Sequence, residues 1–433
     1  MRIESVGREW SLLNVRKEKS RSLHALDALN FCNAGIQTGL GPFMSIYYTA
    51  VRHWNPGQIG ILLACQSLSG IAVQSLVGNF VDQSHHKRLL TALTGTVVAL
   101  GALGIAILPG FAVQVAVQLV IGLAVTVFPA ATSAFALGMV DPDKVTGRLA
   151  RNEGFAHTGN VVFAIAAGAV GTLLALNGIF YAAAVFAAGM APSALLIEES
   201  QVSYEAARGG TEPKQGREAD RRSFRELLAD KRILTFTVVV VIFYFANAAT
   251  LPIVGEILTQ GKKSHESAWQ VAAAVIVAES VMIGVAIGAG KLADKWGRKP
   301  LFLLGFAVLA LRNVLTVVSH NEYYLISLQA CDGVAMGLYG VLLKLVTSDL
   351  AKGTGRFNFL QGAVQSSMGL GGMLSNSIFG WIAKAFGFNA SFWGLAGAAL
   401  VGGALYQFKM PETKPQNEGQ DDVPEANPAT QSI

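Results

Sequence analysis

Residues 290–299 read Gly-Lys-Leu-Ala-Asp-Lys-Trp-Gly-Arg-Lys and stand where one long apolar run, 268–294, gives way to the next, 299–319. Each run is long enough for a helix to cross a bilayer core of ~30 Å, which takes about 20 residues. A segment inside lipid must satisfy its own backbone polar groups, so both runs are expected to be helices. The charged decapeptide is therefore predicted to be a short connection at a membrane surface.

The same alternation of apolar runs and short polar connections continues along the whole chain. Of its 433 residues, 52% are hydrophobic and only 14% are charged. A soluble domain carries about 25% charged residues, so much of this surface is predicted to face lipid. The pattern predicts an all-α integral membrane protein with twelve transmembrane helices. The predicted spans are 22–50, 57–81, 88–108, 111–138, 150–175, 178–197, 231–259, 268–294, 299–319, 322–349, 355–384 and 387–409.

The basic residues are concentrated on alternate connections. With the N-terminus inside, the inner connections hold 27 of the 33 Lys and Arg residues, and the outer connections hold only Arg52, Lys262, Lys263 and Lys384. The positive-inside rule then places both termini in the cytoplasm of a multi-pass protein of the inner or plasma membrane. The net charge of +5 follows from this topology, so the lipid bilayer is an expected partner and nucleic acid is not.

One long polar break divides the chain. Residues 198–230 are rich in Glu, Arg, Gly and Gln and cannot bury a core, so they are predicted to form a cytoplasmic linker. The predicted units are a cytoplasmic N-terminus at 1–21, a six-helix bundle at 22–197, the linker, a second six-helix bundle at 231–409, and a disordered cytoplasmic tail at 410–433.

The two predicted bundles repeat four short patterns in the same order, at an offset that drifts only from 214 to 208 residues. Both bundles have six spans and start inside, so the repeat is parallel, an architecture known from transporters with a solute site between the halves. The pairs are Phe31-Cys32-Asn33-Ala34 with Phe245-Ala246-Asn247-Ala248, Gly78/Asp82 with Gly290/Asp294, Gln118/Gly122 with Gln329/Gly333, and Asp141/Arg148 with Asp349/Arg356.

The Gly290–Lys299 stretch resembles the loop signature of the major facilitator superfamily, and Gly78-Asn79-Phe80-Val81-Asp82 resembles a degraded copy. The resemblance covers nearly the whole chain, and it implies solute transport by alternating access. One departure is Gln118, because many proton-driven drug exporters of the family carry Arg at that position. Another is residues 168–171, which lack the proline that such exporters often have in their fifth helix.

By this resemblance, ion pairs would hold the two halves together on the cytoplasmic side. The glycines would allow close approach of helices, and acids at helix ends would accept hydrogen bonds from basic side chains. Alternatively, the basic residues serve only to orient the chain. The first predicted gate comprises Gly78, Asp82, Arg88, Asp141 and Arg148, and the second comprises Gly290, Asp294, Arg298, Asp349 and Arg356.

Polar side chains inside the spans are candidates for the solute cavity. In the first span, Asp27, Asn30, Asn33 and Gln37 recur every three or four residues and share one helix face. The family resemblance implies that helices 1, 4, 7 and 10 line the cavity, which adds Gln114, Gln118, Asn247, Gln329 and Tyr339. Hydrogen bonding between helices is an equally open interpretation of these residues.

Ionisable residues within a membrane are functional candidates by default, because burying their charge is costly. The candidates for proton coupling are Asp27, His157, Glu279, Arg312 and Asp332. Arg312 could pair with Asp332 or with Glu279 in a purely structural contact. His157 could equally be a packing group. Glu256 is expected to lie in water at the outer mouth.

These features predict a secondary transporter that acts as a monomer on a small solute, by proton-coupled efflux. Proton-linked uptake of a sugar or organic acid is the alternative, and a non-transporting membrane sensor is a further one. No nucleotide-binding loop, hydrolase elbow or zinc-protease motif occurs in the sequence, so no enzyme activity and no cofactor are expected. The His and Cys residues do not cluster, so no metal is expected either.

Overall fold

The structure is a computed structural model that describes residues 20–33, 40–141, 144–203, 230–259, 266–351 and 357–414. Secondary structure in these residues is helical throughout, as expected for a membrane-spanning chain. Several predicted features fall outside the described residues, namely Gln37, Arg356, most of the linker and the tail beyond residue 414. The surroundings of Gly78 and the side chain of Asp82 also lie outside the described part.

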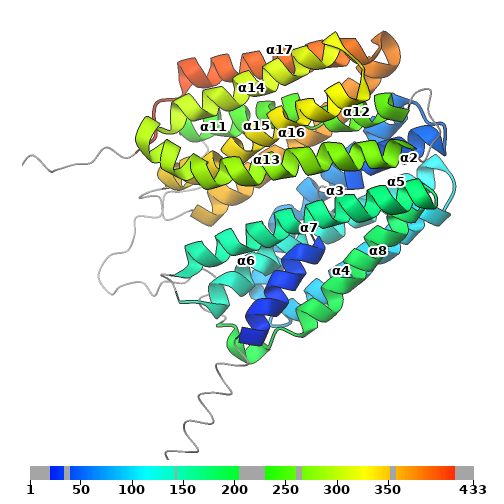
Figure 1. Cartoon of the computed structure of the whole chain (residues 1–433). Coiled ribbons are helices and arrows are strands. Elements are labelled where there is room, and N and C mark those ends of the chain that lie inside the picture. Colours follow the sequence, from blue (N-terminus) through cyan, green and yellow to red (C-terminus); the bar gives the residue numbers. More distant parts are fainter. Residues whose placement is uncertain are drawn as a thin grey trace, which may run out of the picture.

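The N-terminal half comprises the described helices between residues 20 and 203 (Figure 1). It begins with a helix at 20–33, and it ends with a short 3-10 turn, η2, at Glu199–Gln201. The helices between these are α2 (Leu40–Ala50), α3 (Pro56–Gln83), α4 (Lys87–Ile107), α5 (Phe111–Val125), α6 (Val127–Met139), α7 (Val145–Leu173) and α8 (Gly178–Leu195).

The C-terminal half comprises the described residues from 230 to 414 (Figure 1). Its helices are α11 (Lys231–Asn247), α12 (Thr250–Thr259), α13 (Glu266–Trp296), α14 (Arg298–Val318), α15 (Glu322–Ala351), α16 (Phe357–Phe386) and α17 (Phe388–Lys409). The predicted spans match these bounds to within a few residues. The exceptions are the spans at 22–50, 111–138 and 231–259, each of which contains two helices.

Local sequence signals explain where several helices start. Asn55 caps α3 in a full capping box with Gln58, and Pro56 occupies the first turn, where its missing N–H costs nothing. Asp230 caps α11 by accepting the N–H of Arg232. Gly297 separates α13 from α14 with φ +94°, a left-handed conformation that glycine adopts without strain. The second glycine of the 290–299 motif is thus the turn residue between two helices.

Nine helices or helix pairs of the described residues are long and apolar enough to cross a membrane. The long helices α3 and α16 are not among them, and both contain side chains outside the described residues. These two helices pack against each other, one from each half. The nine candidate spans support a multi-pass membrane protein.

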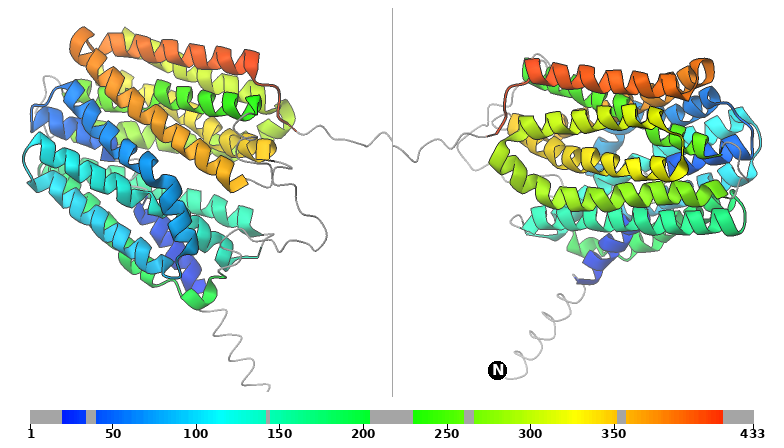
Figure 2. Two further views of the ribbon diagram at one scale, coloured as in Figure 1. Left: turned by 180° about the vertical axis from the view of Figure 1, so that it is seen from behind. Right: turned by 45° about the horizontal axis from the view of Figure 1, so that its top comes forward.

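The two halves meet along three helix pairs, α3 with α16, α7 with α13, and α2 with α12. We call the end of the molecule where α2 and α12 meet the α2/α12 end, and the end where α8 finishes and α11 begins the linker end. The halves converge at the α2/α12 end and spread apart toward the linker end (Figure 2).

The apolar cores follow the same asymmetry. One core fills the N-terminal half and continues across the interface into α12 and the first turns of α13. A second core lies within the C-terminal half, around Phe243, Phe302 and Tyr339. The continuous core at the α2/α12 end indicates that this end is closed by packing.

Candidate functional site

A buried polar contact joins the halves in the middle of α7 and α13. Glu279 of α13 lies 2.7 Å from Nδ1 of His157 and accepts a 2.8 Å hydrogen bond from Nδ2 of Asn160, both on α7. Glu279 is only 6% exposed, so its carboxylate is held by the opposite half of the protein. A rearrangement of the halves would have to break this contact, and a change in its protonation would change its strength.

Small residues place α7 and α13 close together about two turns from this contact, on the side of the α2/α12 end. Gly168 and Gly171 of α7 lie against Ala272 and Ala268 of α13. This is the stretch in which the sequence lacks a proline, and small residues at such positions let membrane helices approach closely. The seam between the halves is therefore tightly packed on that side of Glu279.

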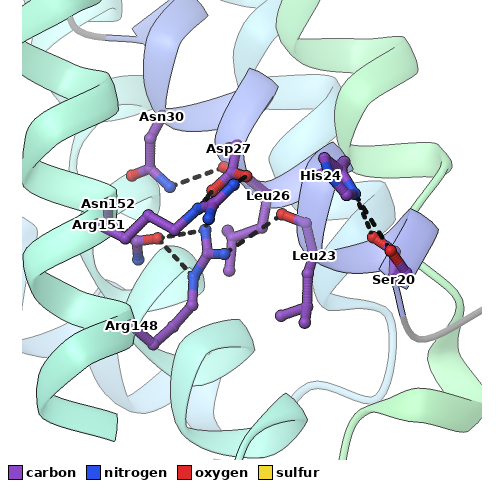
Figure 3. Close-up of polar contacts among 9 residues, drawn as sticks. All are labelled: Ser20, Leu23, His24, Leu26, Asp27, Asn30, Arg148, Arg151 and Asn152. Atoms are coloured by element: carbon purple, nitrogen blue, oxygen red, sulfur yellow. Dashed lines mark hydrogen bonds and ion pairs between the residues drawn. The ribbon is translucent and has the colours of Figure 1, made fainter. Parts of the chain in front are cut away.

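Asp27 takes part in a second buried cluster, within the N-terminal half (Figure 3). Its carboxylate receives Nη2 of Arg148 at 2.6 Å and Nη2 of Arg151 at 2.8 Å. Arg148 also donates to Oδ1 of Asn152 from Nε at 2.9 Å and from Nη2 at 2.6 Å. Through these two guanidinium groups, Asp27 joins the first helix to α7.

Arg312 is 1% exposed and forms an ion pair with Asp332. The sequence allows Arg312 to pair with Asp332 or with Glu279, and in the structure it pairs with Asp332. Glu279 instead contacts His157. The contact joins α14 to α15 inside the C-terminal half. It leaves Nε and Nη2 of Arg312 buried without a hydrogen bond, so one side of this guanidinium is unsatisfied.

The predicted cavity residues divide into two groups by their hydrogen bonds. The amide of Gln114 is engaged on both sides, because it donates to the carbonyl of Leu108 at 2.6 Å and accepts from Tyr48 at 2.7 Å. Tyr339 stacks on Phe243 with ring centroids 3.7 Å apart, and its hydroxyl is buried without a hydrogen bond among the described residues, so it belongs with the second group.

The second group keeps unsatisfied acceptors. Gln118 donates to Met44, Gln329 to its own helix and Asn247 to Met336, and the side-chain carbonyl oxygen of each is buried without a partner. Asn30 donates to the carbonyl of Leu26, and Asn33 is 7% exposed. A buried acceptor without a donor is costly, so these oxygens are the positions where a donor from a solute or from water would be favourable.

At the linker end, Arg298 gathers three helices. Its Nη1 donates to Asp294 at 3.2 Å and to the carbonyl of Ala293 at 2.9 Å, and its Nε donates to Asp349 at 3.2 Å. Three members of the second predicted gate, Asp294, Arg298 and Asp349, are therefore in contact. Within it, α13, α14 and α15 of one half are tied together.

The first predicted gate has different partners. Arg88 pairs with Glu199 at 3.0 Å, Arg148 pairs with Asp27, and Asp141 pairs with Lys144 at 2.7 Å. Arg88 lies at the start of α4 beside η2, and Arg148 faces the first helix, so neither follows the predicted grouping.

Sequence reasoning missed Lys87 as the counterpart of Arg298. Lys87 is 3% exposed and donates to the carbonyl of Val81 at 2.5 Å, and Val81 corresponds to Ala293 in the repeat offset of 212. A cation after each loop therefore donates to the corresponding carbonyl at the end of the preceding helix, beside a backbone N–H from Ser84 or Gly297. The shared offset was the signal that could have identified this role.

Glu412 was also missed. Its carboxylate accepts the backbone N–H groups of Arg298 and Lys299 at 2.9 and 3.0 Å, and so caps the start of α14. Partial burial alone would raise the pKa of Glu412, but hydrogen bonds from the backbone of Lys414, Lys299, Arg298 and Thr413 outweigh it and lower that pKa. A side chain at position 297 would collide with this carboxylate. The contact is thus a second reason, beside the positive φ, for a glycine at this position of the motif.

One exposed ion pair bridges the halves toward the linker end. Lys344 of α15 lies 3.1 Å from Glu153 of α7, and both side chains are 56% exposed. An exposed pair of this kind contributes about 0–1 kcal/mol, so the contact is easily broken.

The α2/α12 end is closed more tightly, and here the expectation for Glu256 is wrong. A Cβ on Gly60 of α3 would collide with the backbone carbonyl of Asn376 of α16, so these helices touch through their backbones. Glu256 is 3% exposed between the halves rather than wet, because α12 packs against α2 and borders the α3–α16 contact.

This architecture, two helical bundles that meet at a polar seam, matches known proteins. A sequence model of the Major Facilitator Superfamily matches residues 26–289 and again residues 236–432. Two proteins of Mycobacterium tuberculosis, from strains CDC 1551 / Oshkosh and ATCC 25618 / H37Rv, are each 37% identical over 396 residues, which cover 91% of this chain and 94% of theirs. The chain belongs to the Major Facilitator Superfamily. Both relatives are described as uncharacterised transporters of that type.

Solved structures agree on the fold of this superfamily member. Two crystal structures of the nucleoside transporter NupG, one of a point mutant, align with TM-scores of 0.72 and 0.67 at 13% identity. Each alignment covers 90% of this chain and at least 99% of NupG. The superfamily assignment supports a transporter of a small-molecule solute rather than an enzyme.

Proposed function

We propose that this protein moves a small solute across the membrane by alternating access, and that the movement is coupled to protons. The observation that carries the proposal is the buried contact of Glu279 with His157 and Asn160 across the two halves. A carboxylate and an imidazole that join two rigid bodies form a contact whose strength depends on protonation. Protonation of the contact would therefore bias how the halves sit relative to each other.

The proposal includes twelve spans in two parallel six-helix repeats. The contacts between helices support the repeat, because they come in corresponding pairs. In the N-terminal half α4 packs on α8, and in the C-terminal half α14 packs on α17. Across the interface, the α3–α16 contact corresponds to the α13–α7 contact in the same way. The helix at 20–33 with α2, and α11 with α12, would each make one broken span.

We place the linker end in the cytoplasm, as the distribution of Lys and Arg predicts. The conformation described above would then be closed toward the outside, and the exposed Lys344–Glu153 pair would join the halves toward the inside. In this arrangement Asp294, Arg298 and Asp349 belong to the cytoplasmic gate, which would re-form contacts when that side closes.

The solute site is proposed along the seam, at the buried acceptors that lack donors. These are the side-chain oxygens of Gln118, Asn247 and Gln329. The buried Asn30 and Asn33 of the first helix are proposed to line the same site. The identity of 13% to NupG concerns the fold, so nucleosides are one class to test among several. Efflux is the proposed direction, because the polar candidates include carboxylates and few aromatic clamps. Proton-linked uptake of a sugar or organic acid is the second candidate.

The experiment is transport in proteoliposomes loaded with a panel of metabolites, nucleosides, sugars and drugs. We expect counterflow of at least one compound and uphill movement when a proton gradient is imposed. The Glu279→Gln variant keeps the shape of the side chain and removes its charge, and it should keep counterflow but lose uphill movement. Uphill movement that survives in Glu279→Gln at the wild-type rate would exclude Glu279 as the coupling group.

The Asn313→Ala variant is a matched control. Asn313 is buried and accepts a 3.0 Å hydrogen bond from Thr250, but within the C-terminal half. Its loss should destabilise the fold without separating counterflow from uphill transport. Binding of a compound without any flux in either mode would favour a membrane sensor instead.

A further inference from the structure

A second buried carboxylate lies at the α2/α12 end. Glu256 is 3% exposed and lines a small cavity between the halves. The walls of the cavity come from α3, α12 and α16, with Ala249 next to α12, and the cavity has room for about one water molecule. The lining residues other than Glu256 are Pro56, Ile59, Gly60, Leu63, Ala249, Pro252, Ile253, Asn376 and Gly380.

Only one other lining residue has a polar side chain. Asn376 of α16 borders the cavity, and its Oδ1 is buried without a hydrogen bond. The carboxylate of Glu256 likewise accepts no hydrogen bond and forms no ion pair with the side chains that the structure describes. The cavity therefore holds an acid without a cation and an acceptor without a donor.

The charged and titratable groups on the neighbouring helices are engaged elsewhere. On α2, Tyr48 donates to Gln114, and Tyr47 packs on Phe180. On α13, Glu279 is held by His157, and the side chain of Glu266 is outside the described residues. The remaining groups on α16 and α17 are Lys384, which lies over Trp381 at 4.3 Å, and Tyr406 and Lys409, which lie toward the linker end.

Burial of a lone carboxylate is strongly unfavourable, because a single water molecule cannot replace its hydration shell. A neutral carboxyl group avoids this cost. It also carries an O–H that can donate to an acceptor such as the orphan Oδ1. When the halves separate at this end, water reaches the same group and the cost of charging it disappears.

On the basis of the alternating access proposed above, we propose that Glu256 is a proton-binding site that takes up a proton from the aqueous phase as the α2/α12 end closes. In the closed state the carboxyl group donates a hydrogen bond to Asn376, which joins α12 to α16. On opening, this bond breaks and the proton returns to the water at that end. Closure at the α2/α12 end is thereby linked to pH.

The test measures the distance between spin labels at Val51 and Phe386, which are exposed near the ends of α2 and α16. The background variant replaces Cys32, Cys65 and Cys331, so that only the two labels react. If closure takes up one proton, the ratio of closed to open molecules should fall about ten-fold for each unit by which the pH rises, over the pH range in which Glu256 titrates. In Glu256→Gln this dependence should weaken to the part that the Glu279–His157 contact supplies, and in Glu256→Gln/Glu279→Gln the closed population should not change with pH.

Two further variants keep the test decisive. Asn376→Leu removes the acceptor at similar volume, and it should lower the closed population at every pH at which wild type is closed. Glu279→Gln should retain the part of the pH dependence that Glu256 supplies, because it alters the other carboxylate. Lys262→Ala and Lys263→Ala, which remove the two cations that follow α12 in the sequence, should retain the full dependence.

A pH profile of Glu256→Gln that matches wild type would overturn the proposal. So would a wild-type distance that responds to a solute but not to pH, and in that case alternating access would still stand. A distance that never changes with either pH or solute would overturn alternating access as well, so the two failures are distinguishable.

Discussion

The two ends of this molecule are held by different kinds of interaction. At the α2/α12 end the halves touch through backbone and apolar groups, as at Gly60 with Asn376 and in the core that continues into α12. Toward the linker end the exposed Lys344–Glu153 pair joins the halves, and ion pairs such as Asp27 with Arg148 and Arg298 with Asp349 tie helices together within each half. The comparison teaches that packing sets one end and charge sets the other, so the two should respond differently to salt, pH and side-chain size.

The seam between the ends combines both kinds of interaction. Small residues bring α7 and α13 together, and Glu279 joins His157 and Asn160 across them. Because this contact lies between the two ends, movement of the halves at either end would change the distance between α7 and α13 here. We therefore expect the two ends to be coupled through this contact.

The largest expected effect comes from breaking the buried charge cluster. Arg148→Ala would leave Asp27 with Arg151 alone, and removing one partner of a buried ion pair costs about 3–5 kcal/mol. The melting temperature of the purified protein should fall by several degrees. The double variant Asp27→Asn/Arg148→Met removes both buried charges and should recover part of the loss. If Arg148→Ala melted like wild type, the cluster would not support the fold.

A smaller effect is expected from size alone at the packed end. Gly60→Ala places a methyl group against the carbonyl of Asn376, and overpacking of this kind costs about 1–3 kcal/mol. It acts on the closed state, so the population with an open α2/α12 end should rise roughly ten-fold. Gly284→Ala is the matched control, because a Cβ there has no atom within 4 Å. Equal distance distributions in the two variants would contradict closure by backbone contact.

The exposed Lys344–Glu153 pair should have a weaker effect, and one that depends on salt. Lys344→Ala should shift the equilibrium between the halves by less than about 1 kcal/mol at low ionic strength. At about 1 M salt the Debye length falls to ~3 Å, so wild type and the variant should converge. A difference that persists at high salt would show that Lys344 acts by something other than charge. Spin-label distances across α7 and α15 measure it.

The smallest expected effect is the pH dependence of the tail contact. The pKa of Glu412 is lowered in the folded state, so the carboxylate stabilises the capped start of α14 above its ordinary pKa of about 4.3. That stabilisation is lost as the pH falls through the lowered value. The mobility of a spin label at Thr413 should be low at neutral pH and rise in acid, whereas Glu412→Gln should be mobile throughout. A label equally immobile in both would exclude the cap.

The sequence predicts the elements of this fold better than their contacts. Apolar runs and capping residues such as Asn55 and Asp230 locate the helices, because those signals act within a few residues. The 290–299 motif likewise predicts the contact of Asp294 with Arg298, which are four residues apart. Two predicted spans, 57–81 and 355–384, correspond to α3 and α16, and their packing on each other across the halves is a contact that the spans themselves do not predict.

Contacts between distant residues depend on which helix faces which, and a helical stripe does not contain that information. Asp27 meets Arg148 across 121 positions, and Glu256 is buried by α3 and α16 rather than wet. Gln114 illustrates the same limit, because its polarity suits a cavity as well as the carbonyls at the end of α4. A polar residue in a span thus identifies a position to examine, and its neighbours decide its role.

The most direct test measures both ends of one protein together. Spin labels at Val51 and Phe386 report the α2/α12 end, and labels at Leu149 and Ser348 report the linker end one turn from the Glu153–Lys344 pair. Alternating access predicts that, with a transported solute or a change of pH, the first distance lengthens as the second shortens. If the two distances lengthened together, or if neither changed under any condition that supports transport, the account would be wrong.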